Sequence, residues 1–96
     1  MRDVGKQCAE LEARLCAYCG GGHARALNSG TDALIIGLAA LGVGCGDEVV
    51  MPPFTFIATA EAARWLGVRP VFCDIDLKTF NIDAALLEAA ITPATK

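Results

Sequence analysis

The chain has 96 residues, fewer than the roughly 150 of an average domain. Hydrophobic residues make up 54% of it and charged residues 20%, which excludes an intrinsically disordered protein because disorder requires low hydrophobicity and high charge. The net charge of −3 leaves no basic surface to neutralise phosphates, so nucleic acid is not an expected partner.

The longest uncharged stretch, residues 33–46, is too short to cross a bilayer, so we expect no membrane association. The charged residues near the N-terminus (Arg2, Asp3 and Lys6) are not followed by the apolar segment of a signal peptide. Without a secretion signal, the five cysteines are expected to be reduced thiols and the protein to be cytoplasmic.

An amphipathic helix is predicted over residues 4–19. Its apolar positions recur every three or four residues, at Val4, Cys8, Leu11, Leu15 and Cys19. The glycines at 20–22 end this helix, since glycine adopts the left-handed C-terminal cap at the least cost. We expect Cys8 and Cys19 to pack along its buried side.

A short strand over residues 23–28 and a helix over 31–41 are predicted next. The strand contains small or apolar residues that suit a tightly covered position. Ser29 is followed three residues later by Asp32 and then by an apolar run, which is the pattern of a capping box at a helix start.

The second half predicts two buried strands that alternate with helices. The elements are a strand at 48–51, a helix at 54–66 that Thr55 caps and Gly67 ends, a strand at 71–73 and a helix at 84–91 that Asp83 caps. This alternation predicts an α/β fold with parallel strands. Three strands make a small sheet, so the chain is expected to be the opening portion of a larger domain.

The junction at residues 29–32 is the best candidate for a binding site. The N–H groups at a helix start lack internal partners, and the helix dipole favours an anion there. Gly30 lets a ligand approach the backbone and Thr31 adds a hydroxyl, which suits a phosphate. An ordinary helix cap explains the same residues. Asp32 would take part only through its backbone N–H, because its carboxylate repels an anion.

Phe56 follows a strand's C-terminal end at the start of the predicted helix, and α/β sheets bind ligands at that edge. The other aromatic residues of the second half are expected in the core; they are Phe54, Trp65 and Phe72. Asp74 and Asp76 come directly after a strand, where a divalent cation is one reading. The favoured reading is that they end the strand and turn the chain.

Zinc has suitable ligand types in the first part of the chain, at Cys8, Cys16, Cys19 and His23. A second closely spaced ligand pair is missing, however, and buried cysteine behaves as a small hydrophobic residue. We therefore predict no metal site.

Several segments in series resemble the DegT/DnrJ/StrS family of pyridoxal-phosphate enzymes, which are mostly sugar aminotransferases. They are SGTDAL, GDEV, PPFTFIATAEA, PVFCDID and AAITPATK. The similarity continues upstream through ELEARLCAYCGGGHA, so it covers nearly the whole chain.

This resemblance implies the large domain of the fold-type-I aminotransferases, with helices around a mainly parallel sheet. Residues 1–96 would form a single incomplete domain, the N-terminal part of the one that binds pyridoxal 5'-phosphate. The resemblance assigns the cofactor phosphate to Gly30, Thr31 and the backbone of Asp32, and places Phe56 against the pyridine ring. The family's Schiff-base lysine would lie outside this chain, so no catalytic residue is assigned and residues 1–96 alone are expected to be inactive.

The activity implied is transfer of an amino group from an amino acid to a keto nucleotide-sugar, in cell-surface polysaccharide or amino-sugar biosynthesis, by a homodimer. Two alternatives remain open. One is a family member that dehydrates its substrate or serves in regulation. The other is a small non-catalytic module that binds zinc through the cysteines and His23.

Overall fold

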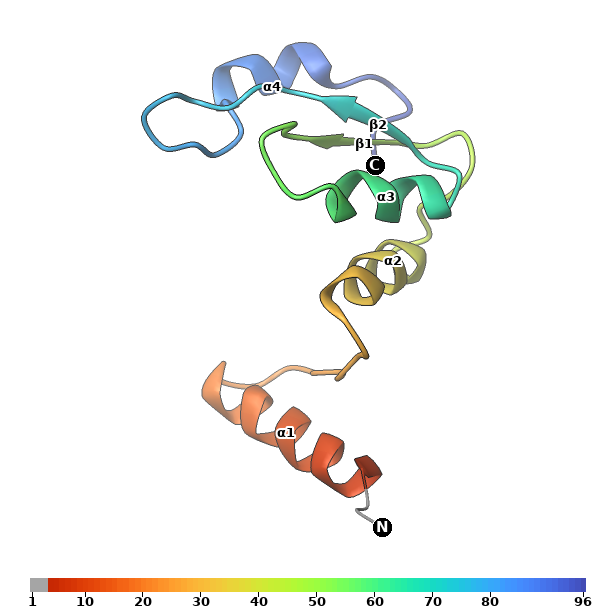
Figure 1. Cartoon of the computed structure of the whole chain (residues 1–96), viewed down its shortest axis with the longest axis vertical. Coiled ribbons are helices and arrows are strands. Elements are labelled where there is room, and N and C mark those ends of the chain that lie inside the picture. Colours follow the sequence, from red (N-terminus) through yellow and green to blue (C-terminus); the bar gives the residue numbers. More distant parts are fainter. Residues whose placement is uncertain (1–3) are drawn as a thin grey trace.

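The computed structural model describes residues 4–96, in which helices alternate with two parallel strands (Figure 1). This confirms the predicted α/β class. The elements are, in chain order, α1 (Val4–Tyr18), α2 (Gly30–Ala40), β1 (Glu48–Met51), α3 (Ala58–Trp65), β2 (Arg69–Phe72) and α4 (Ala84–Ala90). No helix of the described residues is long and apolar enough to cross a membrane.

The two strands pair in parallel from Glu48 opposite Arg69 to Met51 opposite Phe72. The last residues of the chain lie along the other side of β1. There the Glu48 N–H donates to the Ala94 carbonyl at 2.8 Å, and the Lys96 N–H donates to the Glu48 carbonyl at 2.9 Å. Strand β1 is therefore bordered on both sides. Figure 1 shows α3 below the strands and α4 above them.

The core is small and lies between α3 and the sheet. Met51, Ala63 and Val68 form its buried cluster, and partly buried residues such as Val49 and Leu66 surround it. Two alanines of α3, Ala62 and Ala63, are completely buried. Their short side chains let the helix backbone approach the strands closely, and α2 packs against the other side of α3.

The prediction of a strand at residues 23–28 is wrong, because this segment forms no regular structure. A strand needs a neighbour to pair with, and Figure 1 shows the segment linking α1 to α2 away from the sheet. It is held instead by Glu12 of α1. The Glu12 carboxylate accepts the Ala26 N–H at 2.9 Å and lies 3.9 Å from the Arg25 guanidinium.

Helix α1 forms as predicted, but it does not have the predicted buried side. Leu11 and Leu15 are 51% and 45% exposed, Cys8 is half-buried and Cys19 is exposed. The packing expected for Cys19 is therefore wrong. The physical reason is that α1 lies apart from the sheet in Figure 1, so its apolar stripe has no core to face.

Two of the three predicted helix caps are confirmed. The Asp83 carboxylate accepts the Ala85 N–H at 2.8 Å, and the Ser29 hydroxyl accepts the Asp32 N–H at 3.1 Å. Thr55 is not a cap, because α3 begins only at Ala58 and the residue before it, Ile57, makes no side-chain cap bond. The residues between the prolines and Ile57 remain irregular, and there the Thr55 N–H donates to the Pro53 carbonyl.

We expect Gly67→Ala to lower the free energy of unfolding by about 1–2 kcal/mol, because Gly67 has a left-handed φ of +72°. An added Cβ would also lie 2.5 Å from Cys45 Sγ. Urea unfolding measures the loss, and Cys45→Ala in the same background removes the steric part. Gly37→Ala in α2 is the control: its Cβ meets open space, so it should stabilise the helix by roughly 0.5–1 kcal/mol. Equal stability of Gly67→Ala and wild type would contradict the expectation.

Candidate site at the carboxyl edge of the sheet

The start of α2 presents backbone N–H groups without intrahelical acceptors. Ser29 is extended, with φ −153° and ψ 163°, and its hydroxyl oxygen accepts the Asp32 N–H. Its carbonyl accepts the Ala33 N–H at 3.0 Å. These two bonds leave the N–H groups of Gly30 and Thr31 as the donors of the first turn, at the positive end of the helix dipole.

The region around Gly30 is open. Apart from its chain neighbours and the backbone of its own helix, a Cβ built on Gly30 would meet no atom of the described chain within 4 Å, so a ligand can reach the backbone there. Thr31 is half-buried beside it and adds a hydroxyl. Asp32 differs from both, because its N–H already caps the helix through Ser29. A contact from the Asp32 N–H to a phosphate would have to compete with this cap.

Phe56 lies in the segment between β1 and α3, after the C-terminal end of β1. It does not begin a helix as predicted; instead its carbonyl accepts the Thr59 N–H at 3.3 Å, just before α3 is established. The side chain is 77% exposed and lines a cavity of about 260 Å³ together with Pro52, Pro53 and Phe72. The ring is therefore not buried in the core, and it lies after the C-terminal end of a strand, where the sequence places it.

The start of α2 and the segment that carries Phe56 belong to the same side of the molecule. In Figure 1 both strands run from right to left, so their carboxyl ends lie on the left. Helices α2 and α3 both start on that left side. Ligands of α/β sheets bind on the side of the carboxyl ends of the strands. The start of α2, whose free N–H groups suit a phosphate, and the segment that carries the exposed Phe56 both lie on this side.

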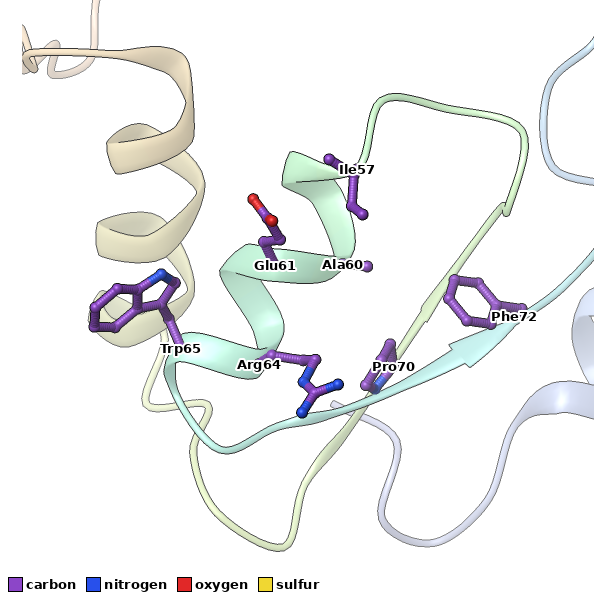
Figure 2. Close-up of a pocket in the computed structure, with 7 residues that line it drawn as sticks. All are labelled: Ile57, Ala60, Glu61, Arg64, Trp65, Pro70 and Phe72. Atoms are coloured by element: carbon purple, nitrogen blue, oxygen red, sulfur yellow. The ribbon is translucent and has the colours of Figure 1, made fainter.

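A larger groove of about 750 Å³ runs along the outer face of α3 and β2 (Figure 2). Its lining is mostly apolar: Ile57, Ala60, Glu61, Arg64, Trp65, Pro70 and Phe72. Trp65 is 78% exposed and Phe72 is 56% exposed, so the expectation that both lie in the core is wrong. Phe54, at 66%, is exposed too. The core of the described chain is too shallow to cover large rings.

Asp74 and Asp76 turn the chain, as the favoured reading of the sequence predicted. The Asp74 carboxylate accepts the Ile75 N–H at 2.7 Å. The Asp76 carboxylate accepts the N–H groups of Lys78 and Thr79, at 2.6 and 3.3 Å. Across residues 4–96, no group of three or more His, Cys, Asp or Glu side chains is placed to hold a metal ion, so the cysteines and His23 do not assemble the zinc site of the alternative hypothesis.

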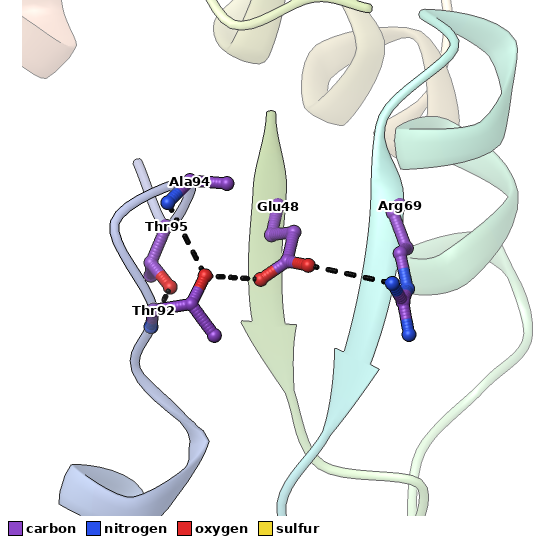
Figure 3. A network of polar contacts seen from close by, with 5 residues as sticks. All are labelled: Glu48, Arg69, Thr92, Ala94 and Thr95. Carbon is purple, nitrogen blue, oxygen red and sulfur yellow. Dashed lines mark hydrogen bonds and ion pairs between the residues drawn. The ribbon is translucent and has the colours of Figure 1, made fainter. Parts of the chain in front are cut away.

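A polar network at the opposite edge fixes the sheet (Figure 3). The Glu48 side chain is only 13% exposed; it accepts the Thr92 hydroxyl at 2.6 Å and lies 3.6 Å from the Arg69 guanidinium. Thr92 in turn accepts the Ala94 N–H at 3.2 Å. The network joins β1, β2 and residues 92–95 at the amino ends of the strands, so it stabilises the sheet away from the candidate site.

A model of the DegT/DnrJ/EryC1/StrS aminotransferase family matches residues 1–96. The UDP-2-acetamido-2-deoxy-3-oxo-D-glucuronate aminotransferase of Pseudomonas aeruginosa is 53% identical over 93 residues, which are 97% of this chain and 26% of that protein. The GDP-perosamine synthase of Caulobacter vibrioides is 50% identical, over 97% of this chain and 25% of that protein. The chain thus spans about a quarter of the length of these relatives.

Solved structures are also similar to this chain in fold. DesV of S. venezuelae, in complex with a ketimine intermediate, superposes with a TM-score of 0.90 at 41% identity, covering 94% of this chain and 24% of DesV. NtdA of Bacillus subtilis, with bound cofactor PMP, gives 0.89 at 45% identity, covering 93% of this chain and 20% of NtdA. The match along all 96 residues and the shared fold show that the chain belongs to the DegT/DnrJ/EryC1/StrS aminotransferase family.

Proposed function

We propose that this chain is the N-terminal part of the large domain of an aminotransferase that uses pyridoxal 5'-phosphate and transfers an amino group to a keto nucleotide-sugar. The observation that carries the proposal is the open start of α2 on the same side of the molecule as the β1–α3 segment, which carries the exposed Phe56 ring. The names of the relatives support the reaction, since one is a UDP-sugar aminotransferase and another a GDP-perosamine synthase.

The described residues fit the cofactor. Gly30 and Thr31 would hold its phosphate through two N–H groups and one hydroxyl, which the helix dipole assists. The Phe56 ring would pack against the pyridine. When bound, the cofactor supplies an aldehyde that takes up the amino group and a ring that withdraws electrons. What residues 30, 31 and 56 contribute is binding and orientation, and Asp32 contributes mainly the helix cap.

The exposed apolar surface supports an incomplete domain. Large hydrophobic side chains are open to solvent on every helix, including Leu15, Ile36, Trp65 and Leu86. Ile57, Trp65 and Phe72 gather in one groove, and a large exposed apolar patch in a soluble protein marks a surface that a partner covers. In the proposal, the rest of the large domain and a second subunit of a homodimer cover it. The amino donor would be an amino acid, and the unpaired state of all five cysteines suits a cytoplasmic location.

Thr31→Leu tests the phosphate site. In the full-length protein this change should raise the Kd for pyridoxal 5'-phosphate about 10- to 100-fold, because a hydrogen bond to a charged group is worth roughly 1.5–3 kcal/mol. Absorbance titration measures it. Pyridoxal without the phosphate is the matched control, and its Kd should not change. An unchanged Kd for the phosphorylated cofactor would refute the assignment of Thr31.

Phe56→Leu tests the ring. Aromatic stacking contributes about 0.5–1.5 kcal/mol beyond burial, so the Kd should rise roughly two- to twelve-fold. In contrast to the Thr31 variant, this one should weaken pyridoxal and its phosphate by the same factor. A loss confined to the phosphorylated form would show that Phe56 does not contact the ring.

A further inference from the structure

Phe80 has a left-handed backbone, with φ 59°, and is the one non-glycine residue with positive φ among residues 4–96. A bulky side chain rarely adopts this conformation, because its Cβ crowds the following carbonyl. Such strain persists only where the surrounding structure enforces it, and it concentrates at functional positions. The left-handed backbone of Phe80 therefore has a structural cause, and it determines where the Phe80 side chain lies.

The cause is the closed turn that contains Phe80. The Phe80 N–H donates to the Asp76 carbonyl at 2.8 Å, and the Asp76 N–H donates to the Asn81 carbonyl at 2.9 Å. An antiparallel bridge between Ile75 and Ile82 closes the base of the turn. These bonds fix the backbone on both sides of Phe80, so the left-handed conformation follows from the turn.

The consequence is the position of the Phe80 ring. It packs against the ring of Phe54, with centroids 5.8 Å apart and planes inclined by 31°. Both side chains are more than half exposed, at 58% and 66%, so burial in the core does not explain their contact. The pair joins the turn after β2 to the segment after β1.

Phe56 is two residues beyond Phe54 and is held from both directions. On its C-terminal side, the carbonyls of Phe56 and Ile57 accept N–H groups of residues 59–61 in the first turn of α3. On its N-terminal side, the contact of Phe54 with Phe80 restrains the segment. Apart from that contact, one hydrogen bond of the described chain holds the segment between the prolines and Phe56, from the Thr55 N–H to the Pro53 carbonyl.

We infer that Phe80 is a positioning residue for the cofactor site: through Phe54 it holds the β1–α3 segment so that the Phe56 ring is presented at the carboxyl edge of the sheet. The inference rests on the proposed function, because it needs Phe56 to meet the cofactor ring. Phe80 itself needs no contact with the cofactor. Its effect on binding therefore cannot exceed the effect of removing the Phe56 ring.

Phe80→Leu in the full-length protein should raise the Kd for pyridoxal 5'-phosphate at least about twofold and by no more than the roughly twelve-fold limit of the Phe56 stack. Phe54→Leu should have the same effect, and the double variant no more than either alone. Phe80→Gly should weaken binding as much as Phe80→Leu, even though glycine relieves the backbone strain and preserves stability to urea. Leu77→Ala, in the same turn and 82% exposed, is the control and should change nothing.

A merely structural role would lower stability and leave the Kd unchanged, and that result would overturn the inference. So would a weakening by Phe80→Leu that persists in a Phe56→Leu background, because it would mean direct contact with the ligand. Failure of the proposed function can be distinguished from failure of this inference. If Thr31→Leu and Phe56→Leu both leave the Kd unchanged, the cofactor site itself is elsewhere; if both weaken binding and Phe80→Leu does not, only the role of Phe80 is refuted.

Discussion

Replacing Ala63 by aspartate is expected to unfold the part of the chain built on the sheet. Ala63 is completely buried on α3 and belongs to the same cluster as Met51 and Val68. An unpaired carboxylate there would have no hydrogen-bond donor and would cost several kcal/mol in lost hydration. A domain is stable by only about 5–15 kcal/mol, and this core is small, so a loss of several kcal/mol removes most or all of the free energy of unfolding.

Circular dichroism and urea unfolding measure the outcome. The Ala63→Asp variant should lose its cooperative transition, while Ala13→Asp on the exposed surface of α1 should unfold within about 0.5 kcal/mol of wild type. Ala63→Val separates size from charge, since a larger apolar side chain should cost only about 1–3 kcal/mol. A normal transition for Ala63→Asp would show that α3 does not pack on the sheet as described.

Features with local causes could be predicted from the sequence. Ser29 and Asp83 cap their helices because a short side-chain oxygen reaches an N–H only two or three residues away. Gly67 ends α3 because it accepts a left-handed φ. The parallel strands followed from apolar runs separated by a helix, and their pairing is confirmed.

Features that depend on distant neighbours could not be predicted. Residues 23–28 have the composition of a covered strand, yet a strand forms only where another strand offers its hydrogen bonds. Trp65 and Phe72 are apolar, yet they line an open groove because nothing in the described chain covers them. Hydrophobicity indicates which side chains favour burial and leaves open what buries them.

Some residues of the candidate site could likewise be predicted from local sequence, and one could not. The start of α2 and Phe56 were predicted because the edge rule for α/β sheets and the cap signal of Ser29 both act over short stretches. Phe80 was missed. Its left-handed backbone is set by bonds among Asp76, Asn81 and the bridge at the base of the turn, and phenylalanine itself carries no signal for positive φ. Only the acidic residues of that turn indicated that the chain reverses there.

Residues 1–96 alone are expected to catalyse no amino transfer. The reaction needs a lysine whose amine bonds to the cofactor aldehyde and then moves a proton. The chain contains three lysines, Lys6, Lys78 and Lys96. Lys6 is on α1, which lies apart from the sheet in Figure 1, whereas the candidate site is at the carboxyl edge of the strands.

Lys96 is at the wrong edge of the sheet. Its N–H donates to the carbonyl of Glu48, the first residue of β1, whereas Phe56 follows the last residue of that strand. Three steps of about 3.3 Å along β1 place the two ends roughly 10 Å apart. Lys78 is in the turn after β2, where its N–H donates to the Asp76 carboxylate and its side chain is exposed. An exposed, hydrated amine is not held in a fixed position against an aldehyde.

Borohydride reduction in the presence of pyridoxal 5'-phosphate, followed by mass spectrometry of residues 1–96, tests this expectation. The expected result is scattered substoichiometric labelling and no turnover with a keto sugar nucleotide and glutamate. Lys78→Arg is the matched variant, because it keeps the charge of the turn and removes the one lysine of that turn. A stoichiometric adduct at Lys78 in wild type, lost in Lys78→Arg and accompanied by amino transfer, would contradict the prediction and would make the turn that carries Phe80 part of the catalytic site.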